Sequence, residues 1–369
     1  MNKETLNGFQ PDYALPPGET LRETLDAIGM TQAELAERTG RPKKTINEII
    51  KGLTAIKPET ALQFERVLGV PASFWNKLES DYQEALARLR DEAQLQEQIA
   101  WVETFPIRDL VNKKWIPKKD SSIEYLKVLL CFFGIAGMKE WEVVWGEQKV
   151  AYRKSRAFNS RPASVAAWLR KGEIEARKVD CKPYNEKAFL AALKEIRGLT
   201  ASPPDVFEPA MKEHCAKAGT ALVFIPELPG THLYGATRWL GTAKALIQLS
   251  LRGKSDDHLW FTFFHEAGHI LKHGKKEVFI EAKDEGCRDM AGPDKEEEAN
   301  LFAQEFLMPK VHYQQFLHEG DFTVSAVRRF AAKIGIAPGI IVGRLQHEQH
   351  IPFKSRLNTL KESFRFQEE

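Results

Sequence analysis

The chain has 369 residues, a formal net charge of +2, 43% hydrophobic and 28% charged side chains. This length predicts two or three domains, and the composition is that of an ordinary folded protein, which excludes disordered, collagen-like and membrane-embedded classes. Because the net charge is small, any attraction to nucleic acid must be local. The sequence shows no signal peptide and no apolar run of about 18 residues, so we expect a cytoplasmic protein with no membrane partner.

The cysteines give information about compartment and metal chemistry. Cys131, Cys181, Cys215 and Cys287 are scattered, and none forms a C-x-x-C pair. This usage favours a reducing compartment and argues against a zinc site built from cysteines.

Residues 21–40 predict two short helices. The first ends at Gly29, and Thr31 then suits the N-cap of the second, with Glu34 three residues further on. This spacing is a capping box, in which side chains satisfy the free backbone N–H groups at the helix start.

Residues 41–52 predict a further helix with one buried and one polar face. Pro42 suits its first helical position, and Ile46, Ile49 and Ile50 form the buried face. Two short helices joined by a glycine-containing turn, the second with polar residues near its start, are typical of a helix-turn-helix that reads the major groove. Operator DNA is therefore the predicted partner, and a symmetric operator would imply a homodimer.

The balance of basic and acidic residues in this segment also allows a second interpretation. Residues 19–70 contain eight Lys/Arg and eight Asp/Glu, so the domain has no overall positive field and could instead recognise a protein. Residues 41–51 alone are basic, with four Lys/Arg against one Glu. That local excess fits a groove-reading helix on a neutral domain.

The segment from Leu21 to about Trp75 resembles the XRE family of helix-turn-helix domains, and within it the HigA-type antitoxins, which repress their own operons. The resemblance implies an all-α DNA-binding domain over residues 1–72. Base or phosphate contacts would come from Gln32, Lys43, Lys44, Thr45 and Asn47, and phosphate contacts from Arg41 and Lys51.

Residues 73–200 predict a helical linker or middle domain. Its first part, to about residue 100, is a long polar helix, and the later part carries core-type aromatics such as Trp141 and Trp168. Turn residues around Pro203 mark the entry to a third domain, residues 201–369.

The strongest chemical signal is the run from His265 to His269, which reads H-E-x-x-H inside an apolar helical stretch. Residues four apart share a helix face, so the two imidazoles can bind one Zn²⁺. Glu266 lies about 100° further round and can act as the general base on a water molecule.

A third zinc ligand is expected from the next helix, which Pro309 should stop. We assign this ligand to Glu296, and Asn300, four residues later, as the amide that holds a motif histidine. Glu297 and Glu298 compete for the ligand role, and all three carboxylates could instead simply stabilise a helix N-terminus.

His273 is a conceivable extra ligand, but it also suits the end of the motif helix before Gly274. A third histidine six residues after the second is excluded, because that position is Lys275. By residue type alone, Tyr234, Arg238 and His312 are candidates for stabilising an oxyanion.

The run Phe261–Leu271, followed by Glu296-x-x-Ala299-Asn300-x-Phe302-Ala303 and Leu307-Met308-Pro309, resembles the ImmA/IrrE family of metallopeptidases over residues 210–345. The resemblance implies a zincin-like domain in which His265, His269 and Glu296 bind zinc and Glu266 is the catalytic acid/base. It also implies cleavage of a DNA-binding repressor that controls stress or mobile-element genes.

The sequence thus predicts a mainly α protein with a small β-sheet, an α+β fold. Its expected function is that of a DNA-binding, HigA-like regulator fused to a zinc endopeptidase acting on a repressor-like protein in a stress, mobile-element or toxin–antitoxin response. The alternative is an antitoxin-like repressor whose metal domain senses a signal or binds a partner toxin without proteolysis.

Overall fold

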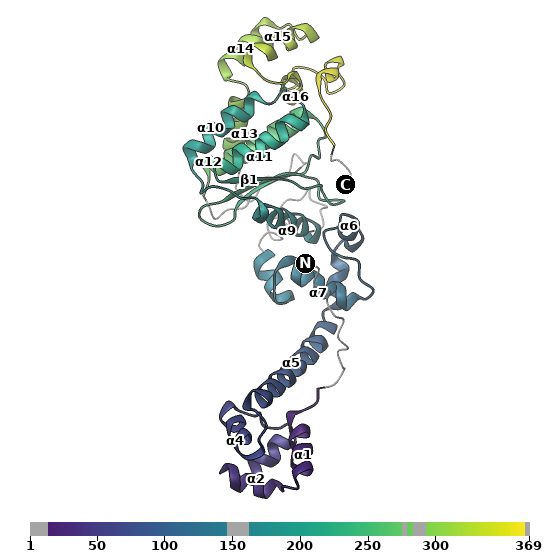
Figure 1. Ribbon diagram of the computed structural model, residues 1–369. Coiled ribbons are helices and arrows are strands. Elements are labelled where there is room, and N and C mark those ends of the chain that lie inside the picture. Colours follow the sequence, from purple (N-terminus) through teal and green to yellow (C-terminus); the bar gives the residue numbers. More distant parts are fainter. Residues whose placement is uncertain (1–13, 146–161, 275–278, 283–292, 366–369) are drawn as a thin grey trace. The chain divides into compact units, whose positions relative to one another are not determined.

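A computed structural model describes residues 14–145, 162–274, 279–282 and 293–365 (Figure 1). The chain separates into two compact units, residues 1–100 and 101–369. Helices dominate both units, and the second also contains a four-stranded sheet, so the predicted α+β class is confirmed. No helix in the described ranges combines the length and the apolar character that crossing a bilayer would require.

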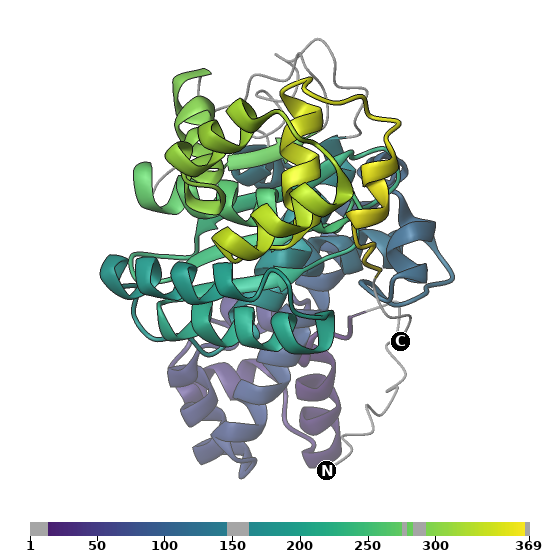
Figure 2. The same ribbon diagram turned by 90° about the horizontal axis from the view of Figure 1, so that it is seen from above.

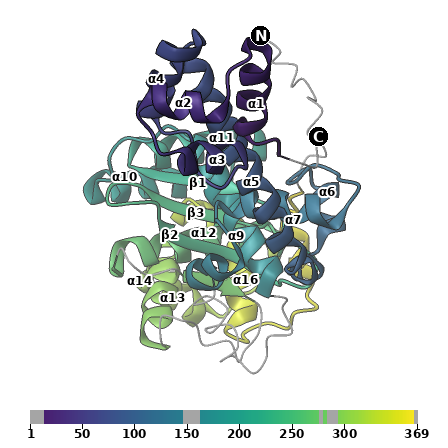
Figure 3. The same cartoon turned by 90° about the horizontal axis from the view of Figure 1, so that it is seen from below.

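The first unit is a small helical bundle that continues into a long helix (Figure 3). In chain order its helices are α1 (Pro17–Ile28), α2 (Gln32–Thr39), α3 (Lys43–Ile50), α4 (Pro58–Leu68) and α5 (Ala72–Gln96). The bundle has its own core, in which Leu21, Leu35, Ile46, Phe64 and Trp75 are fully buried.

The helix boundaries predicted for this unit are confirmed, except that one proline lies one residue outside the helix that it was predicted to begin. Gly29 ends α1 with φ of 67°, a left-handed conformation that costs glycine little. The Thr31 side chain accepts a hydrogen bond from the backbone N–H of Glu34 at 3.2 Å, as a capping box requires. Pro42 stands at the N-cap of α3, one residue before the first helical position predicted for it.

The second unit begins with helices that precede its sheet. These are the 3₁₀ helix η1 (Ile99–Thr104), α6 (Ile107–Asn112), α7 (Ser122–Phe133), α9 (Pro162–Lys178), α10 (Glu186–Gly198) and α11 (Pro204–Lys217). Phe189, Leu193 and Ile196 of α10 are buried in the same hydrophobic core as the sheet. Part of the predicted middle segment therefore shares a core with the sheet.

The sheet contains β1 (Thr220–Phe224), β2 (Leu233–Trp239), β3 (Ala245–Leu249) and β4 (Phe279–Ala282), in the order β1-β3-β2-β4. β3 runs parallel to β1 and antiparallel to β2, and β4 pairs antiparallel with β2. All five residues of β3 are buried, as expected of a strand covered on both faces.

Helices cover both faces of the sheet (Figure 1). α9 packs on one face, where Trp168 Nε1 donates to the carbonyl of Ile225 at 2.9 Å and Gln248 Nε2 donates to the carbonyl of Trp168 at 2.8 Å. α11 and the motif helix α12 (Asp256–Lys272) contact the strands from the other side.

The remaining helices follow the sheet. They are α13 (Pro293–Leu307), α14 (Lys310–Glu319), α15 (Val324–Ile334), α16 (Pro338–His347) and the 3₁₀ helix η2 (Arg356–Leu360). α13 and α16 both pack directly on α12. Figure 2 shows the helices of this part of the chain, coloured green to yellow, lying side by side. α13 ends directly before Met308 and Pro309, where the proline was expected to stop it.

A buried ion-pair network links α9 to β2. The Glu173 carboxylate lies 3.1 Å from the Arg238 guanidinium and 3.0 Å from that of Arg170, and the three side chains are 11–14% exposed. Burial would raise the pKa of the Glu173 carboxyl, but the surrounding arginines lower it overall. This network fixes the strand that passes over the motif helix.

We expect Glu173→Gln to lower the free energy of unfolding by about 3 kcal/mol, because it leaves two buried guanidinium groups without a counter-charge. Denaturant unfolding of the full chain measures the change. The matched control is Glu175→Gln on the same helix, whose partners Lys171 and Lys178 are more exposed and whose loss should cost about 1 kcal/mol or less. Equal losses in the two variants would contradict a structural role for the network.

Candidate functional site

The motif helix α12 is held in place by its own apolar face. Trp260, Phe263, Phe264 and Ala267 are fully buried in the core of the second unit. The motif residues are buried as well: His265 and His269 are 2% exposed and Glu266 is 0% exposed. Buried polar groups are retained when they bond to one another or to a ligand.

α13 can approach α12 closely because residue 268 is a glycine. A Cβ atom at Gly268 would lie 3.2 Å from the Cα of Ala299 and 3.1 Å from a ring carbon of Phe302. These distances are at the limit of packing, so a larger residue would push the helices apart. The absence of a side chain therefore helps to bring Glu296 and Asn300 to the motif histidines.

Three ligand atoms converge between the two helices. The Glu296 carboxylate oxygens lie 3.1 Å from His265 Nε2 and 3.2 Å from His269 Nε2, and the two Nε2 atoms are 2.9 Å apart. Among the described residues this is the group of His, Cys, Asp and Glu side chains placed to hold a metal ion, with all ligand atoms within 4.8 Å of one another. Glu297 and Glu298 do not join it.

The protonation states of this cluster suit a cation. Burial lowers the pKa of His269 to about 4, so its imidazole is neutral near pH 7 and keeps a lone pair for a metal. Burial would raise the pKa of the Glu296 carboxyl, but hydrogen bonds from the two histidines lower it to about 2. Two imidazole nitrogens and one carboxylate form a donor set that fits a divalent metal.

The second nitrogen of each imidazole also has a partner. His265 Nδ1 lies 3.0 Å from the side-chain oxygen of Asn300, and His269 Nδ1 lies 3.0 Å from His273 Nδ1. His273 in turn contacts the Glu298 carboxylate at 3.2 Å. Such contacts fix the tautomer and the ring orientation, so that Nε2 of each motif histidine faces the cluster.

His273 is the C-cap residue of α12. Of the two roles predicted for it, extra ligand or end of the motif helix, the structure therefore confirms the second. Its bond to His269 gives it a further role that the sequence did not assign. The spacing of four residues contained the signal, since it places the two rings on one helix face. Phe279 of β4, whose ring stacks on His269 at 4.1 Å, was not anticipated, because a contact between the motif helix and a strand has no local signature in the sequence.

Glu266 lies beneath strand β2. A Cβ atom at Gly235 would be 2.6 Å from Glu266 Oε1 and 2.7 Å from Cγ2 of Thr262, so the strand can pass this close only with glycine at this position. The Thr237 hydroxyl donates to the backbone carbonyl of Glu266 at 3.3 Å. Backbone of an antiparallel strand therefore runs directly beside the expected general base.

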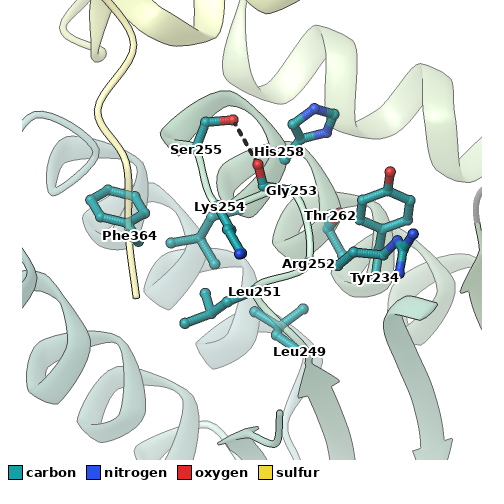
Figure 4. A pocket seen from close by; sticks show the side chains of 11 residues that line it. Tyr234, Leu249, Leu251, Arg252, Gly253, Lys254, Ser255, His258, Thr262 and Phe364 are labelled. Atoms are coloured by element: carbon teal, nitrogen blue, oxygen red, sulfur yellow. Dashed lines mark hydrogen bonds between the residues drawn. The ribbon is translucent and has the colours of Figure 1, made fainter. Parts of the chain in front are cut away.

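A small pocket lies next to this strand at the beginning of α12 (Figure 4). Tyr234 of β2 lines it and stacks on His258 of α12 with ring centroids 5.7 Å apart. Of the oxyanion candidates, Arg238 donates hydrogen bonds to the Glu173 carboxylate and to the carbonyl of Leu169. These bonds hold its guanidinium away from the metal cluster.

In the first unit the expected DNA-contacting residues lie on α2, on α3 and at its two ends. Lys43, Lys44 and Lys51 are exposed, whereas Gln32, Thr45 and Asn47 are half-buried. Arg41 Nε donates to the Gln63 side chain of α4 at 2.6 Å, so part of its hydrogen-bonding capacity is used within the bundle.

Solved structures similar to this chain include three antidote or antitoxin proteins. They are an addiction module antidote protein of a HigA family from Coxiella burnetii (26% identity, TM-score 0.22, covering 23% of this chain and 92% of that one) and the Pseudomonas aeruginosa antitoxin HigA with higBA promoter (29%, 0.22, 23% and 94%). The third is a putative antidote protein of a plasmid maintenance system from Nostoc punctiforme (28%, 0.22, 24% and 94%).

A comparison with curated proteins found no match. Two family models match separate parts of the chain: helix-turn-helix at residues 21–75, and IrrE N-terminal-like domain, a peptidase family, at residues 221–346. The second match spans the sheet, the motif helix α12 and α13. The chain therefore carries an XRE-type helix-turn-helix domain near its N-terminus and an ImmA/IrrE-like domain of the peptidase family toward its C-terminus.

Proposed function

We propose that the ImmA/IrrE-like domain is a zinc-dependent endopeptidase that cleaves a regulatory protein, and that the helix-turn-helix domain binds operator DNA. The observation that carries the proposal is the convergence of His265 Nε2, His269 Nε2 and a Glu296 oxygen within 4.8 Å, beside a glutamate of the same motif. Three protein ligands with one further position left for solvent are the usual arrangement of a catalytic zinc site.

His265, His269 and Glu296 would hold the zinc ion. When bound, zinc polarises a scissile carbonyl and lowers the pKa of water toward about 7. Asn300 and His273 keep the ligand imidazoles in the tautomer that this binding needs. This assignment of ligands agrees with the neutral state of His269 and the ionised state of Glu296 near pH 7.

Glu266 would act as general base and then as general acid. It accepts a proton from the attacking water and delivers it to the amine that leaves when the peptide bond breaks.

The DNA-binding role rests on α2 and α3. By this proposal bases and phosphates would be contacted by Gln32, Lys43, Lys44, Thr45 and Asn47, and phosphates alone by Arg41 and Lys51. Operator DNA as partner implies a cytoplasmic protein, and a homodimer would suit a symmetric operator. The substrate would then be a repressor-like protein at the same genes.

One observation favours a second function. Glu266 is 0% exposed and both motif histidines are 2% exposed, so the centre is shielded from bulk water in this conformation. A centre of this kind would suit an antitoxin-like repressor whose metal domain senses a signal or binds a partner toxin. A peptidase would need this site to open before a substrate could reach the motif residues.

Replacing the general base separates these functions. We expect Glu266→Gln to lower the rate of peptide cleavage by about 10²–10⁴-fold, because the proton acceptor is lost while the metal ligands remain. Zinc content should stay near the wild-type value. Cleavage of a candidate repressor, followed by mass spectrometry, measures the effect, with Glu297→Gln on the exposed side of α13 as control. Unchanged cleavage in Glu266→Gln would contradict the assignment.

A lysine substitution tests the DNA-binding role. We expect Lys43→Ala to weaken binding to upstream DNA and to reduce the slope of log K against log salt by about 1, because one phosphate contact is lost. Lys77→Ala, on the exposed side of α5, is the matched control and should leave the slope unchanged. Binding that does not depend on salt in the wild-type protein would instead support recognition of a protein by this domain.

A further inference from the structure

Arg197 of α10 connects the ends of two later helices. Its Nε donates to the backbone carbonyls of Phe306 at 2.9 Å and Leu307 at 3.1 Å, at the end of α13. Its Nη2 donates to the carbonyl of Leu307 and to that of Ile334, the last residue of α15, both at 2.8 Å. The functions argued so far make no use of this residue.

The carbonyls that Arg197 contacts are groups that a helix cannot satisfy by itself. The last four carbonyls of an α-helix have no N–H partner within that helix, and they carry the negative end of its dipole. The half-buried guanidinium of Arg197 supplies both the donors and the opposite charge. Arg197 therefore caps the C-terminus of α13, although it lies 109 residues before Phe306 in the chain.

The helix that carries this arginine is itself held firmly. Leu193 and Ile196 of α10 are fully buried in the core of the second unit. The Asn185 side chain caps the start of α10 by accepting from the N–H of Ala188 at 2.9 Å. The N–H of Asn185 donates to the carbonyl of Ala218, just before β1, at 3.2 Å. α10 is thus a fixed support for the end of α13.

The candidate metal ligand of α13 depends on where this helix lies along its axis. Glu296 precedes Leu307 by eleven residues, which is about 16 Å of helix. A shift of α13 by one residue would move the Glu296 carboxylate by about 1.5 Å and turn it by about 100°. Metal–ligand distances are defined to within about 0.2 Å, so the site requires a fixed axial position of α13.

Hydrogen bonds fix an axial position better than apolar packing does. Apolar contacts are non-directional, whereas a hydrogen bond weakens when its distance or angle changes. Two donors of one planar guanidinium, placed on successive carbonyls, define both the height and the rotation of the helix end. Arg344 of α16 also donates to the carbonyls of Gln304 and Met308, both at 3.2 Å. The bonds from Arg197 are the shorter ones.

We propose that Arg197 is a positioning residue of the metal site, which holds α13 so that the Glu296 carboxylate meets the two motif histidines. The inference rests on the proposed function, because it needs the metal ligands named there. Arg197 lies before residue 221, where the match to the IrrE N-terminal-like domain begins. α10 is therefore a working part of the metal-binding domain, and displacement of α10 weakens zinc binding.

The zinc affinity of the full chain, measured by competition with a chromophoric chelator, tests this role. We expect Arg197→Ala to weaken zinc binding by about 10-fold or more, the scale on which loss of a residue that orients a metal ligand is felt. Arg197→Lys keeps the charge but replaces the planar fork by one ammonium group, so it should recover only part of the affinity. Unchanged affinity in Arg197→Ala, or complete recovery in Arg197→Lys, would overturn the inference.

Thr200→Val is the matched control for a general loss of stability. The buried Thr200 hydroxyl accepts from the N–H of Ala337 at 3.2 Å and donates to the carbonyl of Arg197 at 3.0 Å. The variant removes these bonds beside α10 and leaves the Arg197 guanidinium in place. It should lower the free energy of unfolding and keep the wild-type zinc affinity. Equal losses of zinc affinity in Thr200→Val and Arg197→Ala would overturn the positioning role.

The cobalt-loaded chain gives a readout that does not depend on affinity. The visible absorption of bound Co²⁺ reports its ligands and their geometry. The spectrum of Arg197→Ala should therefore shift towards that of Glu296→Ala, whereas Thr200→Val should keep the wild-type spectrum. A wild-type spectrum in Arg197→Ala would contradict the proposal.

The outcomes also separate this inference from the peptidase function. The expected zinc affinities without cleavage of any candidate repressor would overturn the peptidase and leave the positioning role. Cleavage by the wild-type chain, together with wild-type zinc affinity in Arg197→Ala, would overturn the positioning role and leave the peptidase. A wild-type chain that takes up neither zinc nor cobalt would overturn both.

Discussion

The close packing of α13 against α12 is the constraint on which the candidate metal site depends. Two histidines on one helix can hold only part of a metal site, and the third ligand must come from outside that helix. Gly268 lets the backbone of α13 approach at Ala299, and this approach carries Glu296 to within 3.2 Å of both histidine Nε2 atoms. The position inside the motif that bears no side chain therefore contributes to the geometry of the site.

The same packing leaves the centre deeply buried. β2 passes over Glu266 with only a glycine between them, and the Phe279 ring covers His269. Burial keeps the His269 imidazole neutral and strengthens every electrostatic interaction in the site, which favours metal binding. It also limits access of a peptide to the motif residues.

Much of this could be predicted from the sequence where the signal is local. The helix spacing of His265 and His269, the cap at Thr31 and the left-handed end at Gly29 each depend on residues a few positions apart. The order of the strands, the burial of α10 with the sheet and the ion pair of Arg238 with Glu173 could not be predicted, because they join residues that are distant along the chain. The position of Glu296 is an intermediate case. Helix spacing restricted the candidate carboxylates to a few neighbours, and the packing of two helices decides which of them reaches the histidines.

The measurement that tests the central claim most directly is the zinc content of the purified full chain, determined by elemental analysis beside that of Glu296→Ala. We predict about one zinc per chain in the wild-type protein and a loss of most of it in the variant, which removes the only ligand supplied by α13. Wild-type protein that takes up no zinc, or a Glu296→Ala variant that retains it as tightly, would contradict the metal centre described above.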